Sequence, residues 1–355
     1  MKEHRIVSEK IVVIFNTLFI CHSKTLLLIN LKNKNMSVLI FTEIDNGALK
    51  KSSLEAVHYG SEVAKMKGTT ATVLAIGTAT DDELAKAGNF GASKVLHAND
   101  SRLANGNIQA YSDVLSLAVI QEGAETIILA MSSLGNAVAA RVAAKLKASI
   151  VSNVTELPDF SNGIKVTRSI YTGKAFAKVE MKGEKQIIAV KKNAISVVES
   201  SNLATVEPFT PTLKESDFAV KVTGSHKASG AISLPEADLV VSAGRGLKGP
   251  ENWSIVEDLA NALGAATACS KPVSDLDWRP HHEHVGQTGI KVSPNLYIAA
   301  GISGAIQHLA GVNSSKVIVV INKDPEAPFF KAADYGIVGD VFDILPRLTK
   351  AVKAL

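Results

Sequence analysis

The chain has 355 residues, of which 46% are hydrophobic and 20% are charged, and its formal net charge is only +4. This length allows two domains of ordinary size, and the weak, scattered charge gives no reason to expect nucleic acid or an anionic membrane as a partner. Two isolated cysteines, Cys21 and Cys269, exclude a disulfide scaffold or a cysteine-rich zinc site and suit a reducing cytoplasm.

The first 35 residues are the least regular part of the sequence. Their apolar stretch is interrupted by Asn16, His22, Lys24 and Asn30, so no run is long enough for a membrane span. Met36 then opens the strand-like sequence MSVLIFTE. We interpret residues 1–35 as an extension upstream of the natural start, with a signal or membrane anchor as the alternative.

Residues 36–215 read as one α/β domain. The pattern predicts strands at 37–43, 71–77, 94–98 and 125–131, and helices at 48–67, 81–89, 108–123 and 134–148. Strands that alternate with helices indicate a parallel sheet covered on both faces. Between about 150 and 200 the period changes to two, which predicts antiparallel strands that extend this sheet. The polar, proline-containing residues 200–216 are expected to be a linker.

Residues 216–355 read as a second α/β domain. Strands are expected at 237–242, 265–268, 296–300, 316–321 and 335–338, with helices at 253–263, shortly after Gly301, and after Pro346. The sequence therefore predicts two α/β domains in series.

The sequence GRGLKG, residues 244–249, has the GxGxxG spacing that follows the first strand of a dinucleotide-binding unit. In such a unit an acidic residue about 20 positions later binds the ribose. Here the next strand ends in Cys269-Ser270-Lys271 and offers no carboxylate. The turn suits phosphate binding or close backbone packing. A stand-alone NAD(P)-dependent oxidoreductase remains an alternative, although the acidic residue that would bind the ribose is absent from this position.

Stronger signals lie downstream. VGQTG, residues 285–289, is a polar turn bounded by glycine, and residues 296–311 read as strand, glycine turn and helix. Polar side chains follow four predicted strands, at Arg245, Ser270, Ser303 and Asn322. Because parallel α/β sheets bind ligands at the carboxyl ends of their strands, this edge is the expected site of an anionic ligand such as a pyrophosphate.

Several long motifs resemble one known family. LYIAAGISGAIQHLAGVNSSKVIVVIN, GRGLKGPENW, VGQTG and NKDPEAPFFKAADYGIVGD are similar to the motifs of electron transfer flavoprotein alpha subunits, and the resemblance covers essentially all of residues 36–355. One small departure is Val320, where alanine is usual. The resemblance implies an N-terminal parallel α/β domain of the nucleotide-hydrolase type and a C-terminal Rossmann-like FAD-binding domain.

The resemblance also implies a function. The chain is expected to be an electron carrier rather than an enzyme, to bind FAD, and to form a heterodimer in which the beta subunit contacts the first domain, completes the pocket and binds AMP. Electrons would pass from dehydrogenases, such as the acyl-CoA dehydrogenases of fatty acid beta-oxidation, to a membrane quinone oxidoreductase, with the heterodimer itself in the cytoplasm. An NADH-dependent, electron-bifurcating complex and a non-redox scaffold that has lost its flavin are alternatives.

Carried over motif by motif, the resemblance assigns FAD contacts to Arg245, Ser270, Lys271, His284, Val285, Gly286, Gln287, Thr288, Ser303, Gly304, Ala305, Ile306, Gln307, His308, Asn322, Asp340 and Val341. Thr288 would hydrogen-bond the flavin N5 atom, and His308 would lie near the flavin O2 edge. Lys271 stands where the family usually has arginine. It keeps the positive charge but lacks the planar guanidinium, so it is expected to act electrostatically and not by stacking.

The histidines of the sequence HHEH have a second interpretation. His282 and His284 could chelate a metal ion, but no cysteine or suitably spaced carboxylate completes such a site. A solvated loop beside the flavin, with His284 reaching toward it, is the preferred interpretation.

Overall fold

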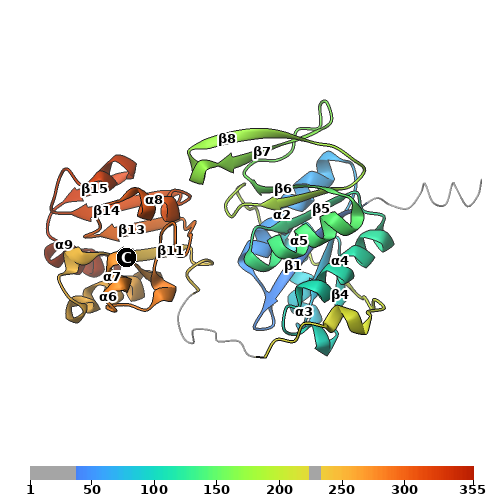
Figure 1. Ribbon diagram of the computed structural model, residues 1–355, viewed down its shortest axis with the longest axis horizontal. Helices are drawn as coiled ribbons and strands as arrows, with labels where there is room; N and C mark the ends of the chain where they lie inside the picture. Colours follow the sequence, from blue (N-terminus) through green and yellow to red (C-terminus); the bar gives the residue numbers. More distant parts are fainter. Residues whose placement is uncertain (1–36, 224–232) are drawn as a thin grey trace, which may run out of the picture.

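The computed structural model describes residues 37–223 and 233–355, so the predicted extension at residues 1–35 lies outside the described residues. Two separate sheets, each with its own helices, are visible in Figure 1. Among the described residues, no helix is both long enough and apolar enough to cross a membrane.

The first sheet has ten strands in the order β10-β4-β3-β1-β5-β9-β6-β7-β8, with β2 paired to β1. Its strands are β1 Val38–Asp45, β2 Ala48–Leu49, β3 Ala71–Ile76, β4 Lys94–Ala98, β5 Thr126–Ala130, β6 Ser149–Val154, β7 Ile164–Ile170, β8 Ala175–Met181, β9 Gln186–Val190 and β10 Thr205–Pro208. Its helices are α2 Lys51–Met66, α3 Asp81–Ala85, α4 Ile108–Glu122 and α5 Ser133–Leu146.

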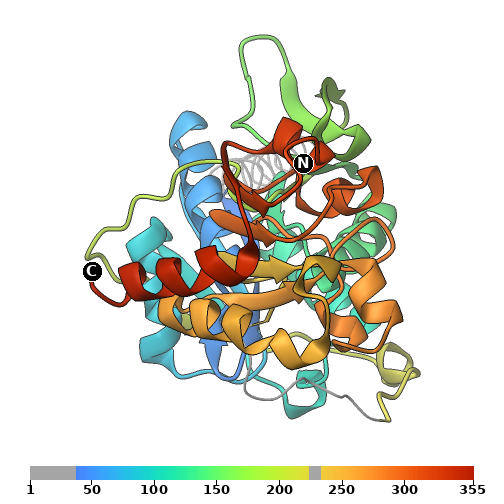
Figure 2. The same ribbon diagram turned by 90° about the vertical axis from the view of Figure 1, so that its left-hand side faces the viewer.

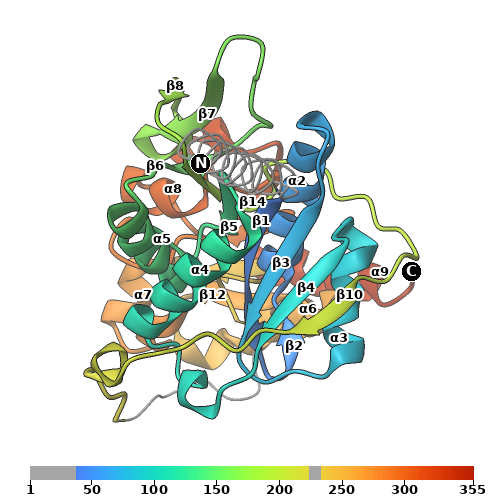
Figure 3. The ribbon, with the colours of Figure 1, turned by 90° about the vertical axis from the view of Figure 1, so that its right-hand side faces the viewer.

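Helices cover both faces of this sheet. Ile40 and its neighbours on one face pack against α2, whereas Leu39 on the other face packs against α4 and α5. Figure 3 shows α2 on one side of the strands and α4 and α5 on the other. Because consecutive residues of a strand point to opposite faces, a strand segment covered on both sides is expected to be continuously apolar, as residues Val38 to Phe41 of β1 are.

Two predictions for residues 150–216 are wrong in part. β7 and β8 are antiparallel as expected, but β9 pairs parallel with both β5 and β6. Its residues are buried on both faces of the sheet, a condition that favours a central parallel strand. The predicted linker contains β10, which extends the opposite edge of the sheet by pairing with β4. An edge strand tolerates the proline that ends β10, because one side of the strand needs no ladder hydrogen bonds.

The second sheet is entirely parallel, with the order β12-β11-β13-β14-β15. Its elements are β11 Leu239–Ala243, α6 Ser254–Leu263, β12 Ala266–Cys269, α7 Lys271–Asp275, β13 Leu296–Ala300, α8 Ile306–Val312, β14 Val317–Asn322, β15 Tyr335–Val338 and α9 Val341–Val352. Counted within the domain the order is 2-1-3-4-5, a common doubly wound arrangement whose switch point lies between β11 and β13. Figure 2 looks onto α6 and α9, which share a core with one face of this sheet.

The last helix begins earlier than predicted. It starts at Val341, with Asp340 as N-cap, and Pro346 lies inside it rather than in its first turn. The proline removes one backbone donor, but Val341 and Leu345 are buried against the sheet. Leu348 and Val352, which follow the proline, pack against the same core, so apolar packing on both sides of Pro346 keeps the two parts in one helix.

Polar contacts join the two domains. The Lys192 ammonium donates to the backbone oxygens of Glu236 and Ala237 at 2.9 and 3.1 Å, and the Asn193 amide donates to the Ser293 oxygen at 3.0 Å. Lys51 at the start of α2 also pairs with Asp238. The interface between the two domains is therefore rich in charged and amide groups, as interfaces between domains of one chain usually are.

Candidate functional site

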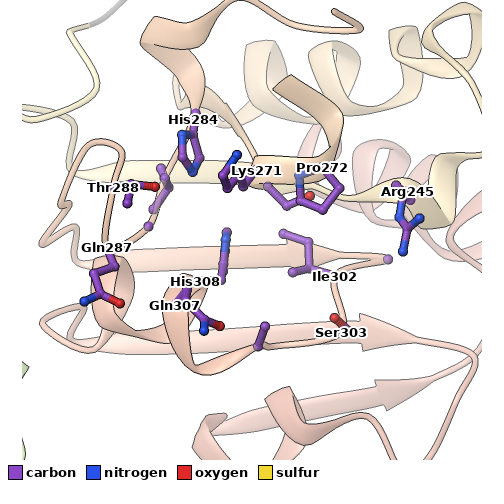
Figure 4. Close-up of a pocket in the computed structure, with 15 residues that line it drawn as sticks. Arg245, Lys271, Pro272, His284, Gln287, Thr288, Ile302, Ser303, Gln307 and His308 are labelled. Atoms are coloured by element: carbon purple, nitrogen blue, oxygen red, sulfur yellow. The ribbon is translucent and has the colours of Figure 1, made fainter. Parts of the chain in front are cut away.

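A cavity of about 330 Å³ opens at the carboxyl ends of β11, β12 and β13, next to the switch point where doubly wound sheets bind ligands. In Figure 4 the side chains around it form a row, with Gln287 and Thr288 at one end, Lys271 and His308 in the middle, and Arg245 and Ser303 at the other end. Its wall is made by Arg245, Ser270, Lys271, Pro272, His284, Val285, Gly286, Gln287, Thr288, Gly301, Ile302, Ser303, Ala305, Gln307 and His308.

The loop that carries Val285 to Thr288 is held in place by its backbone. Val285 N–H donates to the Cys269 oxygen at the end of β12, at 3.0 Å, and Gln287 N–H donates to the Gln307 oxygen in α8, at 2.7 Å. A Cβ atom at Gly286 would lie 3.2 Å from the backbone oxygen of Gln307. The VGQTG turn is therefore fixed between β12 and α8, and the close approach to Gln307 together with a φ of +156° explains the glycine at position 286.

Most of the predicted site residues line this cavity, and five do not. Gly304 packs against Phe329, Ile306 is 70% exposed, Asn322 donates to the Ile302 oxygen at 3.1 Å, Asp340 caps α9 and Val341 is buried in the core. An FAD contact for these five stays a prediction. Pro272, Gly301 and Ile302 line the cavity without having been predicted, and each directly adjoins a predicted residue or a strand end in the sequence.

The GRGLKG turn serves backbone packing. Gly244 and Gly246 donate their N–H groups to the oxygens of Ala300 and Gly301, at 3.0 and 3.1 Å. A Cβ atom at Gly246 would lie 2.6 Å from the Gly301 Cα atom. These donors are used by the end of β13 and are not free to bind a phosphate. Of the two roles that the sequence left open for this turn, the structure supports close packing between β11 and β13.

Lys271 brings a positive charge to the cavity wall and forms an ion pair with Asp275. The Lys271 ammonium contacts both carboxylate oxygens of Asp275, at 2.6 and 2.7 Å, on the solvent-exposed side of α7. Hydrogen bonding from Lys271 lowers the pKa of Asp275. His284 is buried beside this pair, and burial together with the Lys271 charge lowers its pKa. The site therefore holds a cation whose charge is partly balanced by Asp275.

His308 is almost fully buried in the cavity wall. Its Nε2 atom lies 2.9 Å from the Tyr297 hydroxyl, and its Nδ1 atom has no hydrogen-bond partner among the described residues. Burial, with a smaller contribution from His284, lowers the pKa of His308 to about 4; the Val285 backbone, which lies near the imidazole but outside hydrogen-bond geometry, opposes this shift. An unpaired buried polar atom costs about 1–3 kcal/mol. A ligand with a polar edge would satisfy this atom, so the wall fits a flavin.

The other histidines of the HHEH sequence do not converge on a metal site. His281 Nδ1 lies 2.8 Å from the Ser274 hydroxyl, and His282 is exposed. Within residues 37–223 and 233–355, no three histidine, cysteine or acidic side chains gather as a metal site would require.

An arginine outside the cavity anchors the loop that leads into it. Arg279 contacts both carboxylate oxygens of the buried Glu283, at 2.5 and 2.8 Å, reaches Glu257 of α6 at 2.9 Å, and lies over the Trp253 ring. Arg279 could not be predicted from the sequence, because Glu257 lies 22 residues away and the loop that contains Glu283 has no regular pattern that pairs the two. The contacts tie the segment before His284 to the body of the domain.

Replacing Arg279 by methionine is expected to lower the free energy of unfolding by roughly 3 kcal/mol, because Glu283 would be left charged and buried. Urea unfolding followed by circular dichroism, which reports on both domains, would measure this. Lys65→Met is the matched control: it removes an exposed pair with Glu62, and such pairs contribute about 0–1 kcal/mol. Equal losses in the two variants would contradict an anchoring role.

Comparison with known proteins agrees with this geometry. Residues 38–214 match the electron transfer flavoprotein domain, and residues 233–313 match the electron transfer flavoprotein FAD-binding domain. The electron transfer flavoprotein subunit alpha of Bacillus subtilis is 36% identical over 320 residues, which cover 90% of this chain and 98% of that protein. That of Syntrophomonas wolfei is 37% identical over 322 residues, covering 88% and 98%.

A relative from an animal is equally similar. The probable mitochondrial electron transfer flavoprotein subunit alpha of Caenorhabditis elegans is 36% identical over 319 residues, covering 89% of this chain and 93% of that protein. The chain therefore belongs to the family of electron transfer flavoprotein alpha subunits, which are electron carriers, and its second domain is an FAD-binding domain of that family.

Proposed function

We propose that the flavin of FAD lies in the cavity at the ends of β11, β12 and β13, and that the chain carries electrons as one half of a heterodimer with a beta subunit. The observation that carries this proposal is the wall itself: a row of side chains with Arg245 at one end, Thr288 at the other and an unpaired buried Nδ1 atom of His308 between them. When bound, FAD supplies the redox chemistry.

The residues of the chain bind and orient the cofactor. Arg245 and Ser303 at one end suit the phosphates, because guanidinium and hydroxyl groups donate to phosphate oxygens. Thr288 and His308 offer donors toward the polar edges of the ring system. Lys271 places a positive charge beside the ring, which favours negative charge on the reduced flavin. The apolar side chains of Ile302 and Val285 keep water from the ring faces.

In the cell, we propose, the heterodimer is cytoplasmic, receives electrons from dehydrogenases such as those of fatty acid beta-oxidation, and delivers them to a membrane quinone oxidoreductase. This part follows from family membership and from the need of a carrier for a donor and an acceptor. The first domain, with its ten-stranded sheet, offers the surface for the beta subunit.

The charge beside the flavin gives a direct test. Lys271→Met should lower the flavin reduction potential, because a favourable charge is lost, whereas Asp275→Asn should raise it, because Lys271 loses the carboxylate that balances it. Potentiometric titration of the FAD-loaded heterodimer would measure both. Lys86→Met, which breaks an exposed pair in the first domain, should leave the potential unchanged.

Several outcomes would overturn the proposal. A colourless heterodimer would show that no flavin binds in this cavity. Equal potentials in the unsubstituted heterodimer and the three variants would show that Lys271 does not lie close to the flavin. Two flavins per heterodimer, together with bleaching by NADH, would indicate an electron-bifurcating complex instead of a simple electron carrier.

A further inference from the structure

The imidazole of His308 is held by a group that does not line the cavity. Tyr297, the second residue of β13, is fully buried, and its hydroxyl lies 2.9 Å from His308 Nε2. The Phe329 ring stands edge-on to the imidazole with 5.7 Å between ring centroids. Two aromatic rings therefore restrict the imidazole, and Figure 4 shows it directed toward the Lys271 side of the cavity.

The contact between the phenol and the imidazole also decides where the protons lie. Burial raises the pKa of Tyr297 well above its ordinary value, so the phenol keeps its proton, and burial keeps His308 neutral at pH 7. A phenol is a stronger acid than a neutral imidazole N–H, and an imidazole nitrogen is a stronger base than a phenol oxygen. The hydroxyl therefore donates to Nε2, and the imidazole carries its own proton on Nδ1.

We propose that Tyr297 is a positioning residue of the FAD site: its hydroxyl fixes the His308 tautomer that has Nδ1–H, which makes His308 a neutral hydrogen-bond donor for an acceptor atom of the flavin ring. The inference rests on the proposed function in one respect, that the flavin ring occupies this cavity. In this arrangement Lys271 and Arg245 carry the positive charge of the site, and His308 supplies a hydrogen-bond donor with a fixed direction.

The tautomer can be measured without the cofactor. In the heterodimer freed of FAD, with ¹⁵N-labelled histidine, we expect His308 to show a protonated Nδ1 and an unprotonated Nε2 between pH 6 and 8, with its signals identified by their loss in His308→Gln. Tyr297→Phe should give a mixture of both tautomers. Tyr59→Phe is the matched control, because it removes another buried phenol hydrogen bond, to the Glu156 oxygen at 2.7 Å, in the first domain.

Affinity for FAD provides the second measurement. Loss of one oriented neutral hydrogen bond should raise the FAD dissociation constant roughly 3- to 10-fold in Tyr297→Phe and leave it unchanged in Tyr59→Phe. A protonated Nε2 in the unsubstituted protein, or an unaltered tautomer in Tyr297→Phe, would overturn the inference even if FAD binds. Failure of the unsubstituted heterodimer to bind FAD would instead overturn the proposed function, while the tautomer would still be decided by the spectrum.

Discussion

Alanine at Gly301 is expected to lower the free energy of unfolding of the second domain by about 2–4 kcal/mol. Gly301 has a φ of +63°, and its Cβ atom would lie 2.8 Å from the Cα atom of Gly246. The first feature strains any residue with a side chain, and the second pushes the ends of β11 and β13 apart. The same contact shapes the cavity, so FAD should also bind more weakly.

A second glycine separates the two causes. Gly264 has the same φ of +63°, but a Cβ atom there would meet nothing within 4 Å. Gly264→Ala should therefore cost only the backbone strain, about 1 kcal/mol. Urea unfolding of the full chain, followed by the fluorescence of Trp253 and Trp278, would compare the two variants. If both lost equal stability, the contact between the two glycine turns would have no energetic role.

The buried His308 should make the second domain sensitive to acid. The pKa of this group is about 4 in the folded chain and 6.5 when it is unperturbed, so between these values the unfolded chain binds a proton that the folded chain does not. The stabilising effect is complete above pH 6.5 and is lost as the pH falls toward 4. The difference of roughly 2.5 pKa units corresponds to about 3 kcal/mol.

His308→Gln removes this titration, so its free energy of unfolding should fall less steeply than that of the unsubstituted chain between pH 6.5 and 4. Urea unfolding at several pH values, with the same fluorescence signal, would give both curves. His282→Gln is the control, because His282 is exposed in the same domain. Parallel curves for the unsubstituted chain and His308→Gln would show that His308 is not held neutral by burial.

Much of this protein follows from its sequence. Period and composition predicted two α/β domains, and the strands of the second sheet lie within two residues of their predicted bounds, because strands buried on both faces must be continuously apolar. The predicted cavity residues converge because the carboxyl ends of parallel strands meet at one edge of the sheet. The long motifs at 244–253 and 296–322 identified the family, which the comparisons confirm.

The tertiary structure alone decided how certain residues act. Sequence spacing could not show that β9 would insert parallel between β5 and β6, since its apolar run suits either direction. Nor could it show that Gly246 touches Gly301, that Arg279 binds Glu283, or that Tyr297 reaches His308. Local pattern records which residues are apolar or flexible. Which groups then meet, and what proton each one holds, depends on contacts and burial that exist only once the strands have assembled.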